Sequence, residues 1–162
     1  MKAAAMLEPY RGKPALIDSN LLLLRWCAEF DPVLVTSFKR LSGFSAEDVQ
    51  LLQNSLGVFS VIKTTTHVLT EVSNLANSLP QWKKRSWATH FASKIQVIGE
   101  EWIAAAALQT SPALAFGLTD AVLVELSKTY VIVTADFPLS NLLESLRLPV
   151  INFNHLRDAE YQ

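Results

Sequence analysis

The chain has 162 residues, of which half are hydrophobic and 18% are charged, with a formal net charge of −1. This apolar content excludes an intrinsically disordered chain, and the length fits one domain around one core. The charge balance lacks the strong positive excess that many nucleic-acid-binding domains carry. A lone cysteine, Cys27, excludes an intrachain disulfide and agrees with a cytoplasmic location. The longest apolar run, Trp102 to Leu108, is too short to cross a bilayer, so we expect no membrane association.

Strand and helix signals alternate through the first third of the chain. In order, we predict a strand over 14–18, helices over 20–30, 33–41 and 45–56, and a strand over 58–63. Asp31 and Pro32 form a good N-cap and first-turn pair for the second helix. Ser45, with Asp48 three residues later, resembles a capping box at the start of the third. The last strand is predicted from its β-branched residues.

The remainder continues the alternation. Val68, Val72 and Leu75 recur at helical spacing, which indicates an amphipathic helix. In order, we predict helices over 66–79 and 80–98, a short extended piece and a broken helix over 100–116, a helix over 119–128, a strand over 130–134, a helix over 139–146 and a strand over 149–153. Strands that alternate with helices predict an α/β fold, a Rossmann-like three-layer sandwich with a mostly parallel sheet.

Two apolar strands lead into an aspartate. Leu16 and Ile17 run into Asp18, and the strand over 130–134 is followed by Asp136. In open parallel sheets, ligands bind beyond the carboxyl ends of the strands, where both aspartates would lie. Taken singly, each has an ordinary explanation as a helix cap.

Two further acids join this pattern. Glu71 lies beside the apolar stripe of its own predicted helix, and a glutamate that faces a core is rare unless it is paired or bound to a cation. Asp120 falls in the first turn of a predicted helix, where the helix dipole favours an anion. A cluster of four carboxylates repels itself unless a divalent cation neutralises it. Oxygen ligands suit Mg²⁺ or Mn²⁺, and the sequence offers no thiolate or imidazole set for zinc.

Four short motifs around these acids resemble those of the PIN domain family. They are, in order, Ala15-Leu16-Ile17-Asp18-Ser19-Asn20, Thr70-Glu71-Val72, Gly117-Leu118-Thr119-Asp120-Ala121 and Thr134-Ala135-Asp136-Phe137. The resemblance spans about residues 14 to 154 and implies a single PIN-like domain over 1–162. It also implies Mg²⁺- or Mn²⁺-dependent hydrolysis of phosphodiester bonds, usually in RNA. Many bacterial members are VapC-like toxins, each blocked by an antitoxin.

The resemblance also implies roles for individual residues. Asp18 would be the central or bridging metal ligand, and Asp120 and Asp136 would be direct or water-mediated ligands. Glu71 would be a ligand or would position the attacking water. Three neighbours are candidates for orienting the carboxylates, although local turn or cap hydrogen bonds explain them equally well: Ser19, Asn20 and Thr134.

Candidate substrate contacts lie in a basic and aromatic segment over 81–87, which could bind phosphate and stack a base. Its candidate residues are Trp82, Lys83, Lys84 and Arg85. Arg25 and the pair Lys39-Arg40 are weaker candidates. A solvated helix face explains the segment too. The expected partner is RNA, and an antitoxin protein and a second copy of the chain are left open.

Other α/β enzymes fit the sequence less well. A haloacid-dehalogenase-type phosphatase needs a second aspartate two residues after the first, where this chain has Asn20. A dinucleotide-binding domain needs a glycine-rich turn after the first strand, and none is present. Residues 29–57 add more helix than compact toxins of the PIN family usually carry. A housekeeping RNA- or DNA-processing nuclease, and a PIN-like RNA- or protein-binding module without cleavage activity, therefore stay as alternatives.

Overall fold

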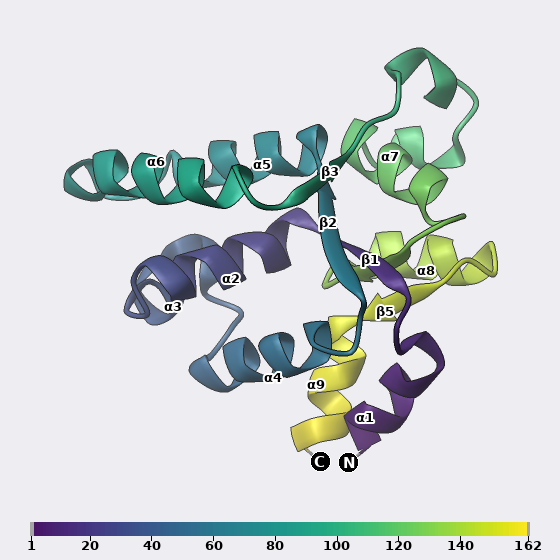
Figure 1. Cartoon of the computed structure of the whole chain (residues 1–162), viewed down its shortest axis with the longest axis horizontal. Coiled ribbons are helices and arrows are strands. Elements are labelled where there is room, and N and C mark those ends of the chain that lie inside the picture. Colours follow the sequence, from purple (N-terminus) through teal and green to yellow (C-terminus); the bar gives the residue numbers. More distant parts are fainter. Residues whose placement is uncertain (1, 162) are drawn as a thin grey trace.

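A five-stranded, all-parallel sheet forms the centre of the molecule, as a computed structural model describes it for residues 2–161 (Figure 1). The strand order is β3-β2-β1-β4-β5. The strands are β1 (Pro14–Ile17), β2 (Val61–Thr65), β3 (Gly99–Glu101), β4 (Val131–Thr134) and β5 (Val150–Asn152). Each neighbouring pair runs parallel. The predicted α/β, Rossmann-like architecture is confirmed.

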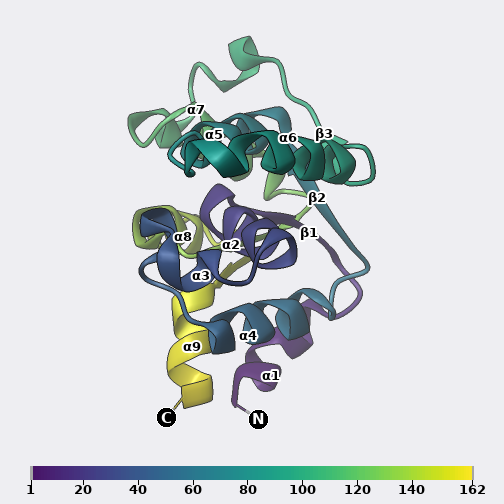
Figure 2. The same cartoon turned by 90° about the vertical axis from the view of Figure 1, so that its left-hand side faces the viewer.

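Helices cover the sheet and complete the three layers. Figures 1 and 2 show one group stacked beside the strands, made of α2 (Ser19–Phe30), α4 (Ala46–Leu56), α5 (Thr66–Ala76) and α6 (Gln81–Ile95). In this group α2 is central and contacts the other three helices. Figure 1 shows a second group to the other side of the strands, made of α7 (Leu118–Leu126) and α8 (Phe137–Ser145). Within residues 2–161, no helix is long and apolar enough to span a bilayer.

The core explains why the central elements form where they do. Leu16 and Ile17 of β1 and Ile132 and Val133 of β4 are fully buried, as expected for strands covered on both faces. The four consecutive leucines over 21–24 are also fully buried. A helix that is apolar on every side is stable only when neighbours surround it, and this is the position of α2.

Both ends of the chain carry helices that the sequence did not predict. These are α1 (Lys2–Leu7), followed by the short 3-10 helix η1 (Glu8–Tyr10), and α9 (Phe153–Tyr161). Helices α1 and α9 pack against each other, and α9 also contacts α4. A partly buried ion pair joins α9 to α4, since Arg157 Nε donates to Asp48 Oδ1 at 2.8 Å.

Several predicted boundaries were wrong. The helix predicted over 33–41 divides into α3 (Leu34–Ser37) and η2 (Lys39–Leu41), because buried Phe38 has an extended backbone. The strand predicted over 58–63 begins only at Val61. Gly99 starts β3 instead of ending a helix. The broken helix predicted before residue 117 is two short 3-10 helices, η3 (Ala105–Leu108) and η4 (Pro112–Ala115).

The predicted capping box is confirmed at α4. Ser45 Oγ accepts a hydrogen bond from the Asp48 backbone nitrogen at 3.3 Å, and Asp48 Oδ2 accepts one from the Ser45 nitrogen at 2.9 Å. We expect Ser45→Ala to lower the free energy of unfolding by about 1 kcal/mol, the usual effect of removing such a cap. Urea titration measures it, and Ser45→Thr, which keeps the hydroxyl, is the control. Equal stability of the alanine variant and the wild type would contradict the assignment.

Candidate carboxylate site

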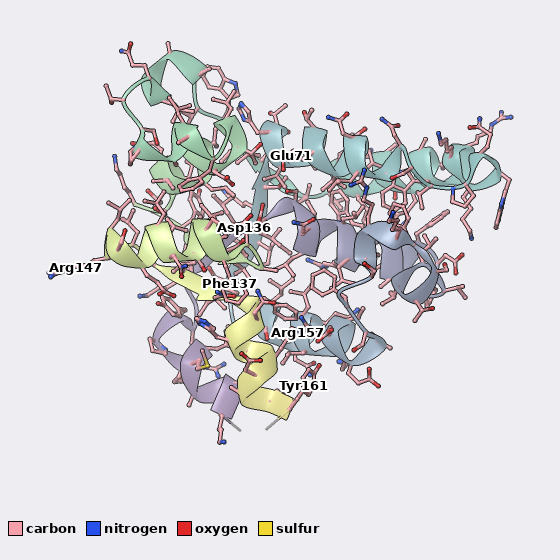
Figure 3. The ribbon with its side chains drawn as sticks, turned by 180° about the vertical axis from the view of Figure 1, so that it is seen from behind. Glu71, Asp136, Phe137, Arg147, Arg157 and Tyr161 are labelled. Carbon is pink, nitrogen blue, oxygen red and sulfur yellow. The ribbon has the colours of Figure 1, made fainter. Side chains whose placement is uncertain are left out.

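Parallel pairing brings the carboxyl ends of the strands to one edge of the sheet, and the four predicted acids lie around it. Asp18 follows β1 directly and Asp136 follows β4 after one intervening residue. Glu71 lies on α5, which begins where β2 ends, and Asp120 lies in the first turn of α7. Figure 3 shows Glu71 on α5 and Asp136 at the start of α8.

Both strand-end aspartates also cap helices. Asp18 Oδ1 accepts a hydrogen bond from the Ser19 nitrogen at 2.7 Å, at the start of α2. Asp136 Oδ1 accepts one from the Leu139 nitrogen at 2.9 Å, at the start of α8. The capping role and the clustering of carboxylates are therefore compatible, because capping uses only part of each carboxylate.

Three hydroxyl groups link the acids to one another. Thr134 Oγ1 donates to Asp18 Oδ2 at 2.7 Å and accepts from the Asp136 nitrogen at 3.0 Å. Ser19 Oγ lies 2.6 Å from Glu71 Oε2 and 3.2 Å from Asp18 Oδ1. The third is the hydroxyl of Thr119, 2.5 Å from Glu71 Oε1. The residues that join β1, β4, α5 and α7 at this edge are thus mainly hydroxyl side chains.

The sequence missed the role of Thr119. The helix was predicted to start at Thr119, but α7 begins at Leu118 and the cap position belongs to Gly117, whose φ of 132° favours glycine. Thr119 therefore lies inside the first turn, and its side chain is free to reach Glu71. Nothing in the local pattern distinguishes these two uses of a threonine, since the contact spans distant segments.

Charge repulsion links the four acids. The pKa of Asp120 is raised to about 7, chiefly by burial and in addition by the charges of Asp18, Asp136 and Glu71. The pKa of Asp18 is also raised, chiefly by its burial, although the hydroxyl of Thr134 and the backbone of Ser19 oppose this. Asp120 receives no hydrogen bond from any residue in 2–161. It is a partly buried acid whose environment disfavours its charge.

The donor chemistry of this edge suits a hard divalent cation, since four carboxylates lie around it. A cation would also relieve the repulsion that raises the pKa of Asp120. Over residues 2–161, no three histidine, cysteine or acidic side chains are already gathered at the distances that hold one ion. Asp18 and Glu71 have both oxygens engaged by hydrogen bonds in this arrangement.

Asparagines near this edge behave differently from the prediction. Asn20 is exposed and bonds to no carboxylate in the described chain, so it does not orient one here. Two residues that the sequence did not single out hold the neighbouring backbone instead. Asn152 Nδ2 donates to Ser140 Oγ at 2.8 Å, and Asn154 Nδ2 donates to the carbonyl of Ala135 at 2.8 Å. The second contact fixes the residue that precedes Asp136.

The predicted substrate contacts divide between two places. Trp82 is 76% exposed, and Lys83 beside it forms an ion pair with Asp31. Lys84 and Arg85 follow on the same helix, partly buried and exposed respectively. Arg25 bonds to Glu29 and lines a hollow with Ser60 and Val61, at the amino end of β2. The structure thus places Arg25 away from the carboxylate edge.

No protein-family model, curated protein or solved structure matches this chain.

Proposed function

We propose that this protein is a metal-dependent nuclease that hydrolyses phosphodiester bonds in RNA. One observation carries the proposal: the charges of Asp18, Glu71 and Asp136 all raise the pKa of Asp120, and no hydrogen bond compensates that carboxylate. Keeping four acids together costs folding free energy, which a divalent cation would offset. Stability of the fold alone does not explain why four acids lie together.

The residues divide into two groups under this proposal. Asp18, Asp120 and Asp136 would hold Mg²⁺ or Mn²⁺, and Thr134 and Ser19 keep the Asp18 carboxylate in one orientation. Such a cation supplies Lewis-acid activation of water and of phosphate oxygens when it is bound. Glu71, held between Ser19 and Thr119, can accept a hydrogen bond from an attacking water once one hydroxyl releases it.

The motif order supports the narrower proposal of a PIN-like nuclease. The acids occur in the order Asp18, Glu71, Asp120 and Asp136, each beside the element that the resemblance implied. Between α2 and β2 the chain adds α3, η2 and α4, the helical elaboration over 29–57. A toxin of a toxin–antitoxin pair, with its antitoxin or a second copy as partner, is a proposal that depends on the nuclease activity.

Incubation with total cellular RNA tests the activity directly. We expect new RNA ends, mapped by sequencing, when the purified protein is supplied with Mn²⁺ or Mg²⁺, and none when EDTA replaces the metal. A matched single-stranded DNA incubation separates ribonuclease from general nuclease activity. Intact RNA in both metals, with a folded protein by circular dichroism, would contradict the proposal and favour the binding module.

A further inference from the structure

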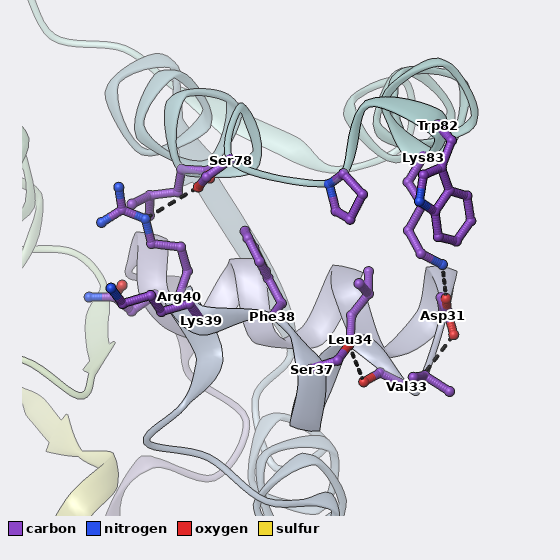
Figure 4. Close-up of a pocket in the computed structure, with 13 residues that line it drawn as sticks. Asp31, Val33, Leu34, Ser37, Phe38, Lys39, Arg40, Ser78, Trp82 and Lys83 are labelled. Carbon is purple, nitrogen blue, oxygen red and sulfur yellow. Dashed lines mark hydrogen bonds and ion pairs between the residues drawn. The ribbon is translucent and has the colours of Figure 1, made fainter.

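A cavity of about 900 Å³ begins next to the carboxylate site. It lies between the segment that carries α3 and η2 and the connection from α5 to α6 (Figure 4). Its wall includes Asn20, two residues after Asp18, and Leu75, which lies one helical turn beyond Glu71 on α5. A chain held at the carboxylates would therefore continue into this cavity.

The middle of the cavity is apolar. Leu34 and Phe38 line it from the α3 side, and Pro80 lines it from the opposite side. Figure 4 shows the side chains of Leu34 and Phe38 directed toward the connection between α5 and α6, which contains Pro80. Phe38 interrupts the helix between α3 and η2, so the irregularity that the sequence did not predict forms part of this wall. A ligand in the middle of the cavity would therefore meet apolar side chains from both sides.

One end of the cavity carries a fixed aromatic ring. The ammonium of Lys83 lies 4.3 Å from the ring centroid of Trp82, and an ion pair with Asp31 holds that lysine in turn. Lys83 covers one face of the indole ring, while the residue as a whole is 76% exposed. The other face is available for stacking. An exposed tryptophan held in this way is a preorganised platform, because less side-chain freedom is lost on binding.

The opposite end of the cavity is basic (Figure 4). Lys39 and Arg40 are both exposed and both line it. Arg40 Nε donates to Ser78 Oγ at 3.4 Å, and no carboxylate in residues 2–161 pairs with either cation. Lys83, by contrast, is neutralised by its partner. The two unpaired cations are thus the positive charges that a ligand in this cavity would meet.

We propose that this cavity binds the stretch of single-stranded RNA that leads away from the bond that is cut, an inference that rests on the proposed nuclease function. One base of this stretch stacks on Trp82, and Lys39 and Arg40 contact its backbone phosphates at the other end of the cavity. Stacking on aromatic rings combined with a basic track is the usual mode of single-strand binding. A duplex would not fit, since its bases are stacked on one another. An apolar helix of a partner protein fits the cavity less well, because it would offer no negative charge to Lys39 and Arg40.

Tryptophan fluorescence tests the proposal without any cleavage. Of the four tryptophans, Trp26 and Trp87 are buried, so a Trp102→Phe background leaves Trp82 as the exposed one. Titration with a ten-nucleotide single-stranded RNA in EDTA is expected to quench its emission. In the same assay by anisotropy, we expect Trp82→Ala to raise Kd about tenfold, the size of one lost stacking contact.

The basic end is tested by the salt dependence of binding. Replacing Lys39 and Arg40 together by alanine should flatten the slope of log Kd against log salt by about 1.4, or about 0.7 for each lost phosphate contact on a single strand. Lys13→Ala with Lys128→Ala removes the same charge at two exposed positions that do not line the cavity, and it should leave the slope unchanged. A double-stranded RNA of the same sequence should bind more weakly.

The outcomes separate this inference from the nuclease proposal. If the wild type cuts RNA and the Trp82 and Lys39–Arg40 variants bind it with unchanged affinity, the proposal of RNA binding in the cavity is contradicted. The nuclease proposal is then still supported. RNA binding that both variants weaken in the anisotropy assay, in a protein that cuts no RNA with any metal, supports binding in the cavity and contradicts the nuclease proposal. Absence of quenching by RNA overturns the inference and favours a protein segment as the occupant. A slope that changes in the Lys13–Lys128 variant and not in the Lys39–Arg40 variant also overturns the inference.

Discussion

Replacement of Asp18 by asparagine is expected to lower RNA cleavage at least about a hundredfold while the fold is kept. Changes to residues that merely orient metal ligands already cost about 10- to 100-fold, and Asp18 is proposed as a ligand itself. Asparagine has nearly the same shape, and its amide oxygen can still accept the hydrogen bond from the Ser19 nitrogen. Its amide NH2 takes the place of Oδ2 and can donate to Thr134 Oγ1 when that hydroxyl turns its own proton away. What the substitution removes is the negative charge that a cation would require.

The measurement is the initial rate of RNA cleavage in Mn²⁺, with the melting temperature recorded beside it. Because burial raises the pKa of Asp18, the asparagine variant should melt no lower than the wild type at neutral pH without metal. Glu144→Gln removes an exposed acid and serves as the control. Full activity in Asp18→Asn would exclude Asp18 as a metal ligand. Loss of activity together with a lower melting temperature would indicate a structural role.

The sequence predicted the fold where local and tertiary preferences agree. The apolar runs that end at Ile17 and Thr134 became the central strands β1 and β4, since such runs are stable only when both faces are covered. Polar caps fixed the starts of α2, α4 and α8 for the same local reason. Both strand-end aspartates were found because parallel pairing makes a strand's last residue predictable in space.

The parts that the sequence did not predict depend on contacts between distant segments. Thr119 was predicted only as the first residue of a helix, although its hydroxyl bonds to Glu71 on another helix. Lys83 was grouped with its neighbours as a candidate substrate contact, but it pairs with Asp31. The basic pair at residues 39–40 and the aromatic at position 82 were treated as separate candidates, and the structure places them on one cavity. Neither the periodicity nor the spacing of residues in the sequence indicates that distant segments line the same cavity.

In the metal-free protein, the contribution of Asp120 to the free energy of unfolding is expected to fall as the pH rises from about 4 to about 7. The pKa of Asp120 is raised from 3.8 in its ordinary environment to about 7 in the folded chain. Between these values the folded state binds the proton more tightly than the unfolded state does, so each rise in pH favours unfolding. Asp18, whose pKa is also raised, acts in the same direction. Below about pH 4 the acid is protonated in both states and the loss disappears.

Asp120→Asn isolates the contribution of this carboxylate. Full conversion of its raised pKa would overstate the effect, because the group is only partly buried, and discounting by about half leaves roughly 2 kcal/mol. At pH 8 without metal, the variant should therefore melt about 4–8 °C above the wild type, and at pH 4 the two should coincide. Scanning calorimetry across this range measures the difference.

Addition of Mn²⁺ at pH 8 should reverse the order of the melting temperatures, so that the wild type melts above Asp120→Asn. A cation that binds only the folded state stabilises it by mass action, by about 2.7 kcal/mol at one hundred times its dissociation constant. The wild type has all four carboxylates and should gain the more, while Asp120→Asn should gain less and cut RNA far more slowly. Equal pH profiles for the two proteins would show that Asp120 carries no repulsion. A cation that binds a carboxylate loses affinity when the charge of that carboxylate is removed. An equal response of the two proteins to Mn²⁺ would therefore exclude Asp120 as a metal ligand and leave Asp18 and Asp136 as the candidate ligands.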